Sequence, residues 1–497
     1  MISTNLLVIL PILLPLVGAV GALLLQHKRP LRDGWTLLVM LVSMSFSFWL
    51  LVTVWQHGEP LVYQSGGWPA PFGISLVADM LSALFVVMVQ VVMATGVIYA
   101  LGSKDMVISY PAFFTFFLML CTGLTGAIMT GDLFNMYVFA ELLVISGTVL
   151  TAVSDDKFGT EAAYKYFYIS LLASFFMLLA IGCLYVSYGT LNMAHLAEAV
   201  RANPERPFLR PAIAFLLATF MVKSATFPFH FWQPDFHTAA PTPVSAMLSS
   251  VVVKFGVYGF LRMTLLLFVA QAVPIRLVLL VAGVIGVIFG GLSALGTHNV
   301  KRMLAYSTLA QVGFILVAIS WGTELAITTA IVFAFNHSLI KAAMLMLAGY
   351  VASRASVKSA AFDVVTGVGK PLPVAGVLFF VGSLALAGIP PTNGFVSKSL
   401  LFTSGFDSAH YWSLLLIGVT SIFTLMYTIR AFQRIWWLTP SAGIYTKPTG
   451  DQLVAPVILL ILIVGLGIWA SPLVTWAQAA AAWLGDPLLY IQAVLGG

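Results

Sequence analysis

Long apolar runs separated by short polar connections follow one another along almost the entire chain. A helix that spans the hydrocarbon core of a bilayer needs about 20 predominantly apolar residues. Of the 497 residues here, 60% are apolar and only 8% are charged, against roughly 25% charged residues in an ordinary soluble domain. The pattern predicts an all-α polytopic membrane protein and excludes a soluble enzyme, a disordered chain and a nucleic-acid-binding protein.

The apolar runs predict about fourteen transmembrane helices joined by short loops. A weaker stretch from Trp476 to Leu495 predicts a tilted terminal helix or an interfacial one. The predicted helices lie near residues 5–25, 35–55, 74–101, 111–130, 132–153, 161–187, 211–240, 245–270, 275–296, 301–320, 325–350, 372–405, 411–437 and 453–470.

The basic residues of the connections predict how these helices are oriented, because cytoplasmic loops are enriched in Lys and Arg. With the N-terminus on the outer, periplasmic side, most basic loop residues from Lys28 to Lys447, Lys301 among them, fall on the cytoplasmic side. We therefore expect a multi-pass protein of the bacterial cell (inner) membrane with an external N-terminus. The opposite side holds Arg201, Arg206, Arg210 and Arg276.

Proline-containing breaks interrupt two of the predicted helices. Pro228 and Pro234 lie inside 211–240, and the segment GIPPTNG at 388–394 interrupts 372–405. Proline removes a backbone donor, and inside hydrocarbon such breaks survive only where protein or water satisfies the freed groups. Interrupted helices at corresponding places of two halves point to an inverted repeat with a transport site.

The spacing of the two breaks predicts the organisation of the chain. Three N-terminal transmembrane helices precede two inverted five-helix repeats, and a C-terminal helix or helices follow. The expected segments are 1–110, 111–270 with a broken helix near 223–240, 275–437 with a broken helix near 388–398, and 438–497.

Several ionisable side chains lie inside the predicted membrane spans. Each charge at mid-bilayer costs roughly 2.5–3.5 kcal/mol on insertion scales, so these groups must be paired, hydrated or neutral. They are Glu141, Lys223, Lys254, Arg262, His337, Lys341 and Lys398.

The lysines beside the breaks suit proton transfer. Lys223 lies just ahead of the first break and Lys398 just after the second. Burial disfavours the ammonium form of a lysine, whereas a nearby carboxylate such as Glu141 restores it. A lysine held between these two influences can load and release a proton as its surroundings rearrange.

His337 and Lys341 are four residues apart and share one helix face. In a hydrated interior they could form two steps of a proton relay. For His337 alone, a core histidine bonded to a neighbour is an equally good interpretation.

The remaining charged groups have structural interpretations. Arg262 lies near a helix end, where its head group can snorkel to the surface. Asp132 follows a glycine at a helix start, where it would cap free amides, and Asp79 is expected within two turns of the outer surface. Capping and conduction stay open for the three residues that border the first break, which are His230, Asp235 and His237.

Motifs for cofactors and metals are missing from the sequence. Cys121 and Cys183 both lie in apolar runs without a second Cys or a His at metal-ligand spacing. No glycine-rich nucleotide-binding fingerprint is present. We therefore expect no cofactor, no metal site and no nucleic-acid partner.

Several ordered motifs resemble those of the antiporter-like subunits of respiratory complex I. GDLFNMYVFAE at 131–141 looks like the helix that carries their key glutamate, and FMVKSATFPFHFWQPD at 220–235 like their first broken helix with its lysine. APTPVSAML at 240–248 continues the match toward Lys254. NVKRMLAYS at 299–307, NHSLIK at 336–341 and GIPPTNGFVSK at 388–398 are similar to the motifs of the second half.

Within this superfamily the chain is most similar to the D-type subunits of Mrp multisubunit Na⁺/H⁺ antiporters. Lys398 departs from the complex I M-type subunit, where a glutamate is usual, and the length leaves no room for the lateral helix of the L-type subunit. The length also excludes the extended Mrp A-type subunit. The N-type subunit fits Lys398 but is less similar around 132–141, whereas the D-type subunit has a similar length, a lysine at both breaks and Lys254 rather than histidine.

The resemblance implies a proton-translocating subunit of a monovalent cation (Na⁺)/proton antiporter, a transporter rather than an enzyme. Its implied partners are A-, B-, C-, E-, F- and G-type subunits, the lipid bilayer, protons and Na⁺. Glu141 would modulate Lys223, and Lys254, His337 and Lys341 would form a hydrophilic axis leading to Lys398. The alternative is the proton-pumping membrane subunit of a complex I or membrane-bound hydrogenase-type oxidoreductase.

Overall fold

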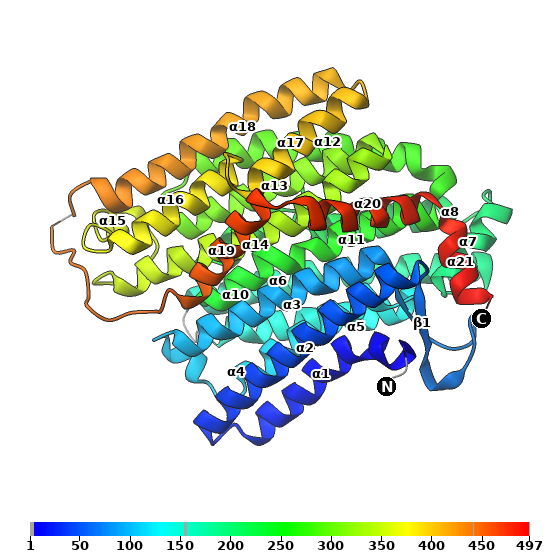
Figure 1. Cartoon of the computed structure of the whole chain (residues 1–497), viewed down its shortest axis with the longest axis horizontal. Coiled ribbons are helices and arrows are strands. Elements are labelled where there is room, and N and C mark those ends of the chain that lie inside the picture. The colour runs from blue at the N-terminus through cyan, green and yellow to red at the C-terminus, as the bar shows by residue number, and fades with distance from the viewer. Residues whose placement is uncertain (1–3, 154–156, 441, 497) are drawn as a thin grey trace.

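The computed structural model describes residues 4–153, 157–440 and 442–496, and most of them are helical (Figure 1). Residues 1–3 and 497, at the outer ends of the expected segments 1–110 and 438–497, lie outside this part. The first half contains α1 (Thr4–Leu24), α2 (Arg29–His57), β1 (Leu61–Gln64), β2 (Ser75–Ala78), α3 (Met80–Gly102), α4 (Phe113–Met129), α5 (Leu133–Ala152), α6 (Lys157–Tyr188), α7 (Met193–Ala202), α8 (Leu209–Lys223), α9 (Trp232–Ala239), α10 (Thr242–Met247) and α11 (Val253–Arg262).

The second half continues the bundle with helices that run alongside those of the first half (Figure 1). It contains α12 (Ala272–Gly296), α13 (Val300–Trp321), α14 (Glu324–Arg354), α15 (Phe362–Val365), α16 (Pro373–Ala387), α17 (Asn393–Asp407), α18 (Tyr411–Phe432), α19 (Val454–Ile468), α20 (Ser471–Gly485) and α21 (Pro487–Leu495).

The predicted polytopic all-α class is confirmed, but the count of about fourteen spans is not. Among the described residues, 10 helices are long and apolar enough to cross a membrane, or up to 11 if the pair α19 and α20, bent by 77°, is one span. Helices α4 and α16 are apolar but shorter. The two inverted five-helix repeats at 111–270 and 275–437 stay a prediction.

Both predicted breaks are present. The first separates α8 from α9 and the second separates α16 from α17. At the first break the hydroxyls of Ser224 and Thr226 donate to Phe220 O (2.6 Å) and Met221 O (3.0 Å), which also accept the backbone N–H groups of the same two residues. Gly388, with φ 83°, ends α16 in the left-handed conformation that glycine adopts without strain.

Polar side chains at helix starts fix where two central helices begin. The Asp132 carboxylate accepts from the Asn135 backbone N–H at 2.8 Å, so the capping role expected for Asp132 is confirmed. The Asp79 carboxylate accepts from the Ser82 N–H at 2.8 Å and starts α3 in the same way. Both caps lie near the hairpin, in which β1 pairs antiparallel with β2.

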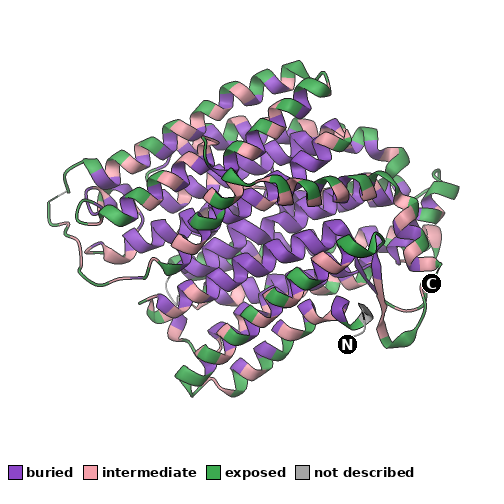
Figure 2. Cartoon of the chain, in the orientation of Figure 1, coloured by how far each residue is buried: buried purple, intermediate pink, exposed green. Residues whose placement is uncertain are grey.

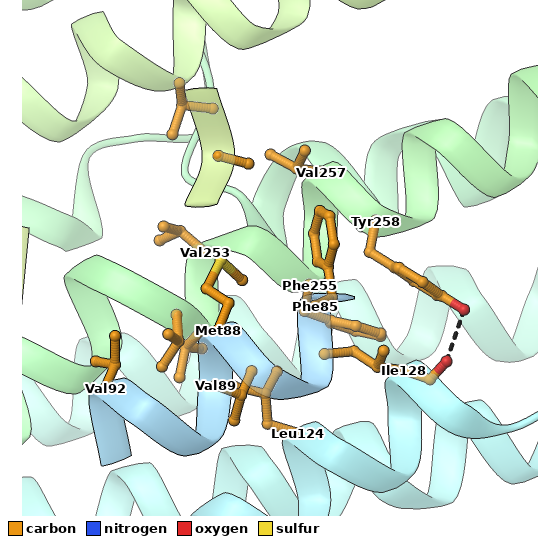
Figure 3. Packing of buried hydrophobic residues seen from close by; sticks show 14 of the residues in the cluster. Phe85, Met88, Val89, Val92, Leu124, Ile128, Val253, Phe255, Val257 and Tyr258 are labelled. Atoms are coloured by element: carbon orange, nitrogen blue, oxygen red, sulfur yellow. Dashed lines mark hydrogen bonds between the residues drawn. The ribbon is translucent and has the colours of Figure 1, made fainter. Parts of the chain in front are cut away.

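The centre of the bundle consists of helices that are buried on all sides over most of their length. Helices α3, α11 and α14 belong to this group, whereas α1, α2, α12 and α18 bury one face only (Figure 2). In Figure 3, Phe85 of α3, Ile128 of α4 and Tyr258 of α11 pack together, and the Tyr258 hydroxyl donates to Ile128 O at 2.6 Å. A charged side chain in this centre has no direct access to the surface.

Candidate functional site

The first group of predicted site residues lies beside the first break. Lys223 is the last residue of α8 and is only 6% exposed. Within the part of the chain that the structure describes, its Nζ makes no hydrogen bond. Glu141, on α5, accepts a hydrogen bond from the Ser174 hydroxyl of α6. The Glu141 carboxylate acts on Lys223 through the Coulomb interaction, although the two side chains form no direct ion pair.

The second group lies at the buried centre, where α11 meets α14. The Nζ of Lys254, which is 0% exposed, lies 2.8 Å from Nδ1 of His337. A proton can reside on either partner of such a pair, because a neutral imidazole nitrogen accepts from an ammonium and an imidazolium donates to an amine. The hydrogen bond therefore joins an α11 lysine to an α14 histidine across the middle of the molecule.

Lys341 lies one turn beyond His337 on the face that the spacing predicted. Its Nζ donates to Leu304 O of α13 at 2.6 Å rather than to His337. Lys341 is nevertheless close enough to His337 and Lys254 for a proton on one of these groups to disfavour a proton on the others. These three groups therefore form one electrostatically connected cluster.

Lys398 lies in α17, just after the second break. Its Nζ donates to Ala387 O, the last residue of α16, at 2.8 Å and lies 5.5 Å from the centre of the Phe314 ring. The C-terminal end of a helix carries partial negative charge, so the end of α16 stabilises the ammonium. His337 and Lys398 also line one cavity of about 10 Å³ together with Gln311, which is about the space that one water molecule needs.

The structure thus brings the six predicted residues into two sets. Glu141 and Lys223 form the first, and the second contains Lys254, His337, Lys341 and Lys398. No described hydrogen bond or ion pair joins Lys223 to Lys254, although α8 packs directly against α11.

Lys301 was assigned to a cytoplasmic loop from the sequence, but it is only 8% exposed. It lies in the first turn of α13, and its Nζ donates to Ala240 O at 3.2 Å. It also lines a polar cavity of about 400 Å³ whose other lining residues include Asp105 and Asp451. The sequence signal that was overlooked is the position of Lys301 two residues after the helix-capping Asn299.

Of the residues that border the first break, Asp235 lies at a partly exposed end of the bundle and His237 lies in the interior. Asp235 forms ion pairs with Lys165 and Arg302, both at 3.0 Å, at a partly exposed end of the bundle. His237 is 0% exposed, and its Nδ1 lies 3.1 Å from the Ser245 hydroxyl. His237 is within electrostatic range of Lys341 and Lys301. It therefore lies between the central cluster, which contains Lys341, and the polar cavity, which Lys301 lines.

Arg262 does not snorkel, which corrects the expectation from its position. Its Nη1 and Nη2 donate to the two carboxylate oxygens of Asp79 at 2.6 and 2.8 Å, and its Nε donates to the Tyr258 hydroxyl at 2.9 Å. Because Asp79 lies 183 positions away in the chain, the sequence could not identify this partner. The structural role expected for Arg262 remains the best interpretation.

The described residues contain no group of three or more His, Cys, Asp or Glu side chains that could hold a metal ion. Cys121 and Cys183 are both free thiols.

Comparison with known proteins places these features in a family. Residues 130–424 match the family described as NADH:quinone oxidoreductase/Mrp antiporter, TM. The chain is 32% identical to the D-type subunit of the Na(+)/H(+) antiporter of Bacillus subtilis (strain 168), covering 98% of this chain and 99% of that one. It is also 32% identical to the N-type subunit of the NADH-quinone oxidoreductase of Desulforudis audaxviator (strain MP104C), with 93% and 94% covered.

Solved structures agree with this placement. A chain of the membrane-bound sulfane sulfur reductase, an archaeal respiratory membrane complex, superimposes with a TM-score of 0.89 at 30% identity, over 99% of this chain and 100% of that one. A chain of the Mrp complex from Dietzia sp. DQ12-45-1b shares the fold, with a TM-score of 0.91 over 100% of both chains at 24% identity. The protein is a multi-pass membrane protein that belongs to the NADH:quinone oxidoreductase/Mrp antiporter transmembrane family.

Proposed function

We propose that this chain is the proton-translocating subunit of a multisubunit monovalent cation (Na⁺)/proton antiporter. The observation that carries the proposal is the hydrogen bond between Lys254 and His337 at the buried centre, with a buried lysine at each flanking break. Ionisable side chains at this depth are energetically costly and rare, and they typically mark ion or proton pathways. The similarity to the D-type subunit of the Bacillus subtilis antiporter supports the cation/proton assignment.

Each predicted residue has a defined task in this proposal. Glu141 stabilises the charged form of Lys223, which is the proton carrier of the first half. Lys254, His337 and Lys341 pass protons along the central cluster. Lys398, held by the end of α16, is the terminal carrier.

The proposal includes the surroundings of the subunit. Its partners are other subunits of the antiporter, of the A, B, C, E, F and G types, in a bacterial inner membrane with the N-terminus outside. The polar cavity beside Lys301 then opens on the cytoplasmic side, because the connections that line it are those that carry most of the basic residues.

A second candidate function is the proton-pumping membrane subunit of an oxidoreductase. The 30% identity to a chain of the membrane-bound sulfane sulfur reductase and the 32% identity to an NADH-quinone oxidoreductase subunit favour it. The proton relay would be the same, but the partners would contain redox centres. Purification of the native complex distinguishes the two, since iron–sulfur proteins in the complex would contradict antiport and small membrane subunits alone would support it.

The relay is tested with Lys223→Ala and Glu141→Ala in inverted vesicles that contain the complete complex. We expect both substitutions to abolish cation-dependent proton flux while the subunit remains assembled. Lys370→Ala and Glu198→Ala are matched controls, because both side chains are exposed. Wild-type exchange by the Lys223 and Glu141 variants would show that the relay assignment is wrong.

A further inference from the structure

A small basic pocket lies where α2 begins and α3 ends. Its volume is about 140 Å³, and its lining includes Arg29, Arg32, Asp33, Asp105 and Phe114. No side chain caps the start of α2 at Arg29. The free N–H groups of an uncapped first turn and the helix dipole together favour an anion at this end.

The guanidinium of Arg32, which lines the pocket, has one nitrogen without a hydrogen-bond partner among the described residues. Its side chain is 3% exposed and lies 5.0 Å from the centre of the Phe114 ring. Nε and Nη2 donate to Asp33 Oδ1 at 3.0 and 2.8 Å, whereas Nη1 has no hydrogen-bond partner among the described residues. A guanidinium presents its donors as a planar fork that suits phosphate oxygens, and a buried donor without a partner is destabilising.

The charges around the pocket favour an anionic ligand. Its two carboxylates already have cationic partners, since Asp33 binds Arg32 and Asp105 lies 2.5 Å from Lys358. Two further basic residues, Lys28 and Lys104, lie next to the pocket in the chain and are exposed. Within the described part of the protein, neither of them nor Arg29 forms an ion pair.

The position of the pocket identifies the source of the anion. Helices α2 and α3 are both membrane spans, so their shared end lies at a bilayer surface. Exposed apolar side chains lie close to its lining residues in the chain, since Leu24 (79% exposed) precedes Arg29 by five residues and Met106 (84% exposed) follows Asp105. A phosphate attached to acyl chains suits both the basic pocket and this apolar rim, whereas a free phosphate suits only the pocket.

We propose that this pocket binds the phosphate of an anionic phospholipid in the leaflet that contacts the start of α2. Arg29, Arg32 and the first turn of α2 contact the phosphate oxygens, and the acyl chains lie along the outer faces of α1 and α2. The site is separate from the lysine relay and does not depend on the proposed transport function.

The test uses the full-length subunit in its complex, delipidated in detergent and titrated with phosphatidylglycerol, with bound lipid measured by native mass spectrometry. Arg29→Gln and Arg32→Gln should each weaken binding about fivefold, the effect of one basic residue near a membrane surface. Asp33→Asn should strengthen binding, because Asp33 competes with phosphate for the Arg32 fork. A misfolded variant would not gain affinity, so Asp33→Asn separates a binding effect from a folding effect.

Arg206→Gln, at an exposed position in the connection before α8, is the control and should bind lipid like the wild type. Equal affinity of the wild type, Arg29→Gln and Asp33→Asn would overturn the proposal. Equal weakening by Arg206→Gln would also overturn it, since binding would then reflect overall charge. If inorganic phosphate stabilises the complex against heat as well as phosphatidylglycerol does, the site binds a free anion and the lipid assignment is wrong.

Discussion

Gln311 lies beside His337 and Lys398, two members of the proposed relay that no hydrogen bond connects directly among the described residues. It lines the cavity of about 10 Å³ that His337 and Lys398 share. Within the described structure, Nε2 of Gln311 and Nε2 of His337 are both buried without a hydrogen-bond partner. A buried polar cavity of this size suits one water molecule, and such a water would bridge the imidazole and the ammonium.

Replacement of Gln311 by leucine should therefore slow proton transfer without loss of the protein from the membrane. We expect Gln311→Leu to reduce cation-dependent proton flux by about tenfold, the effect of one lost buried hydrogen bond on a rate. Gln90→Leu is the matched control, because Gln90 is equally buried on α3 and bonds to Pro11 O and Thr125 outside the relay. Equal flux in Gln311→Leu and wild-type vesicles would remove Gln311 from the pathway.

The Asp79–Arg262 pair makes a second prediction at the residue scale, this time for stability. Breaking a buried, bidentate ion pair by removing one partner costs about 3–5 kcal/mol, because the other charge is left uncompensated. Asp79→Asn and Arg262→Gln should each lower the melting temperature of the purified complex markedly. The double variant should lose less stability than the sum of the losses in the two single variants.

An exposed pair provides the comparison for this experiment. Arg302 and Asp235 form an ion pair at 3.0 Å, but their side chains are 41% and 33% exposed. Exposed ion pairs contribute about 0–1 kcal/mol, so Arg302→Gln should leave the melting temperature nearly unchanged. Additive effects of the Asp79 and Arg262 substitutions would mean that the two charges do not stabilise each other.

At the scale of elements, the second break depends on the close approach of α16 and α17. A Cβ atom on Gly394 would overlap Ala385 O, which is backbone and cannot move independently of α16. Gly394 is four residues ahead of Lys398 and shares its helix face. The position of the Lys398 ammonium against the end of α16 therefore depends on a glycine at 394.

Gly394→Ala should force the two half-helices apart, destabilise the protein by about 1–3 kcal/mol and reduce proton flux. Gly465→Ala is the control, since a Cβ on Gly465 of α19 meets no atom within 4 Å. Flux in inverted vesicles and the melting temperature of the purified complex measure the two effects. A Gly394→Ala variant that melts and transports like the wild type would show that the contact is not needed.

The breaks could be predicted from the sequence because proline and glycine act locally on the backbone. The strands β1 and β2 and the short helix α7 could not be predicted in this way. The strands β1 and β2 are four residues each, and β2 continues directly into α3, so its apolar residues were assigned to the helix predicted at 74–101. Helix α7 spans 10 residues and has a polar face, which is too short and too polar to be identified by a search for apolar spans.

Among the candidate site residues, burial could be predicted from the sequence where a single side chain is anomalous in apolar surroundings. A lysine inside an apolar run needs an explanation wherever the chain folds, and Lys254, Lys341 and Lys398 are all buried. Lys301 and Gln311 were missed because their significance depends on tertiary contacts. A lysine near a helix start and a glutamine in an apolar helix are both ordinary until neighbouring helices enclose them.

At the scale of the whole molecule, the two halves of the bundle suggest the proposed repeats. The most extensive helix pairs are α12 with α13 and α4 with α5, which are the first two helices of each proposed five-helix unit. The broken helix is the fourth element in each unit once the short helices α7 and α15 are set aside. The inverted relation of the units predicts that α4 and α12 enter the membrane from opposite sides.

The orientation of the bundle can be tested with one matched pair of positions on either side of α3. Phe72, in the hairpin before α3, is 90% exposed, and Met106, in the connection after α3, is 84% exposed. If the N-terminus is external, α2 crosses from the cytoplasmic side to the outer side and α3 crosses back. The hairpin between them then lies outside, and Met106 lies in the cytoplasm. Phe72→Cys should therefore react with a membrane-impermeant maleimide on intact cells, and Met106→Cys only after permeabilisation.

Both native cysteines are replaced by alanine in the parent protein, so that the introduced cysteine is the one thiol under test. Cys121 is buried and Cys183 lies half-buried within α6, so neither replacement disturbs an exposed connection. Labelling of Met106→Cys on intact cells, with protection of Phe72→Cys, would reverse the orientation. The Lys301 cavity and the basic pocket at the start of α2 would then both face outward, because Asp105 lines both of them, and the phospholipid bound there would belong to the outer leaflet.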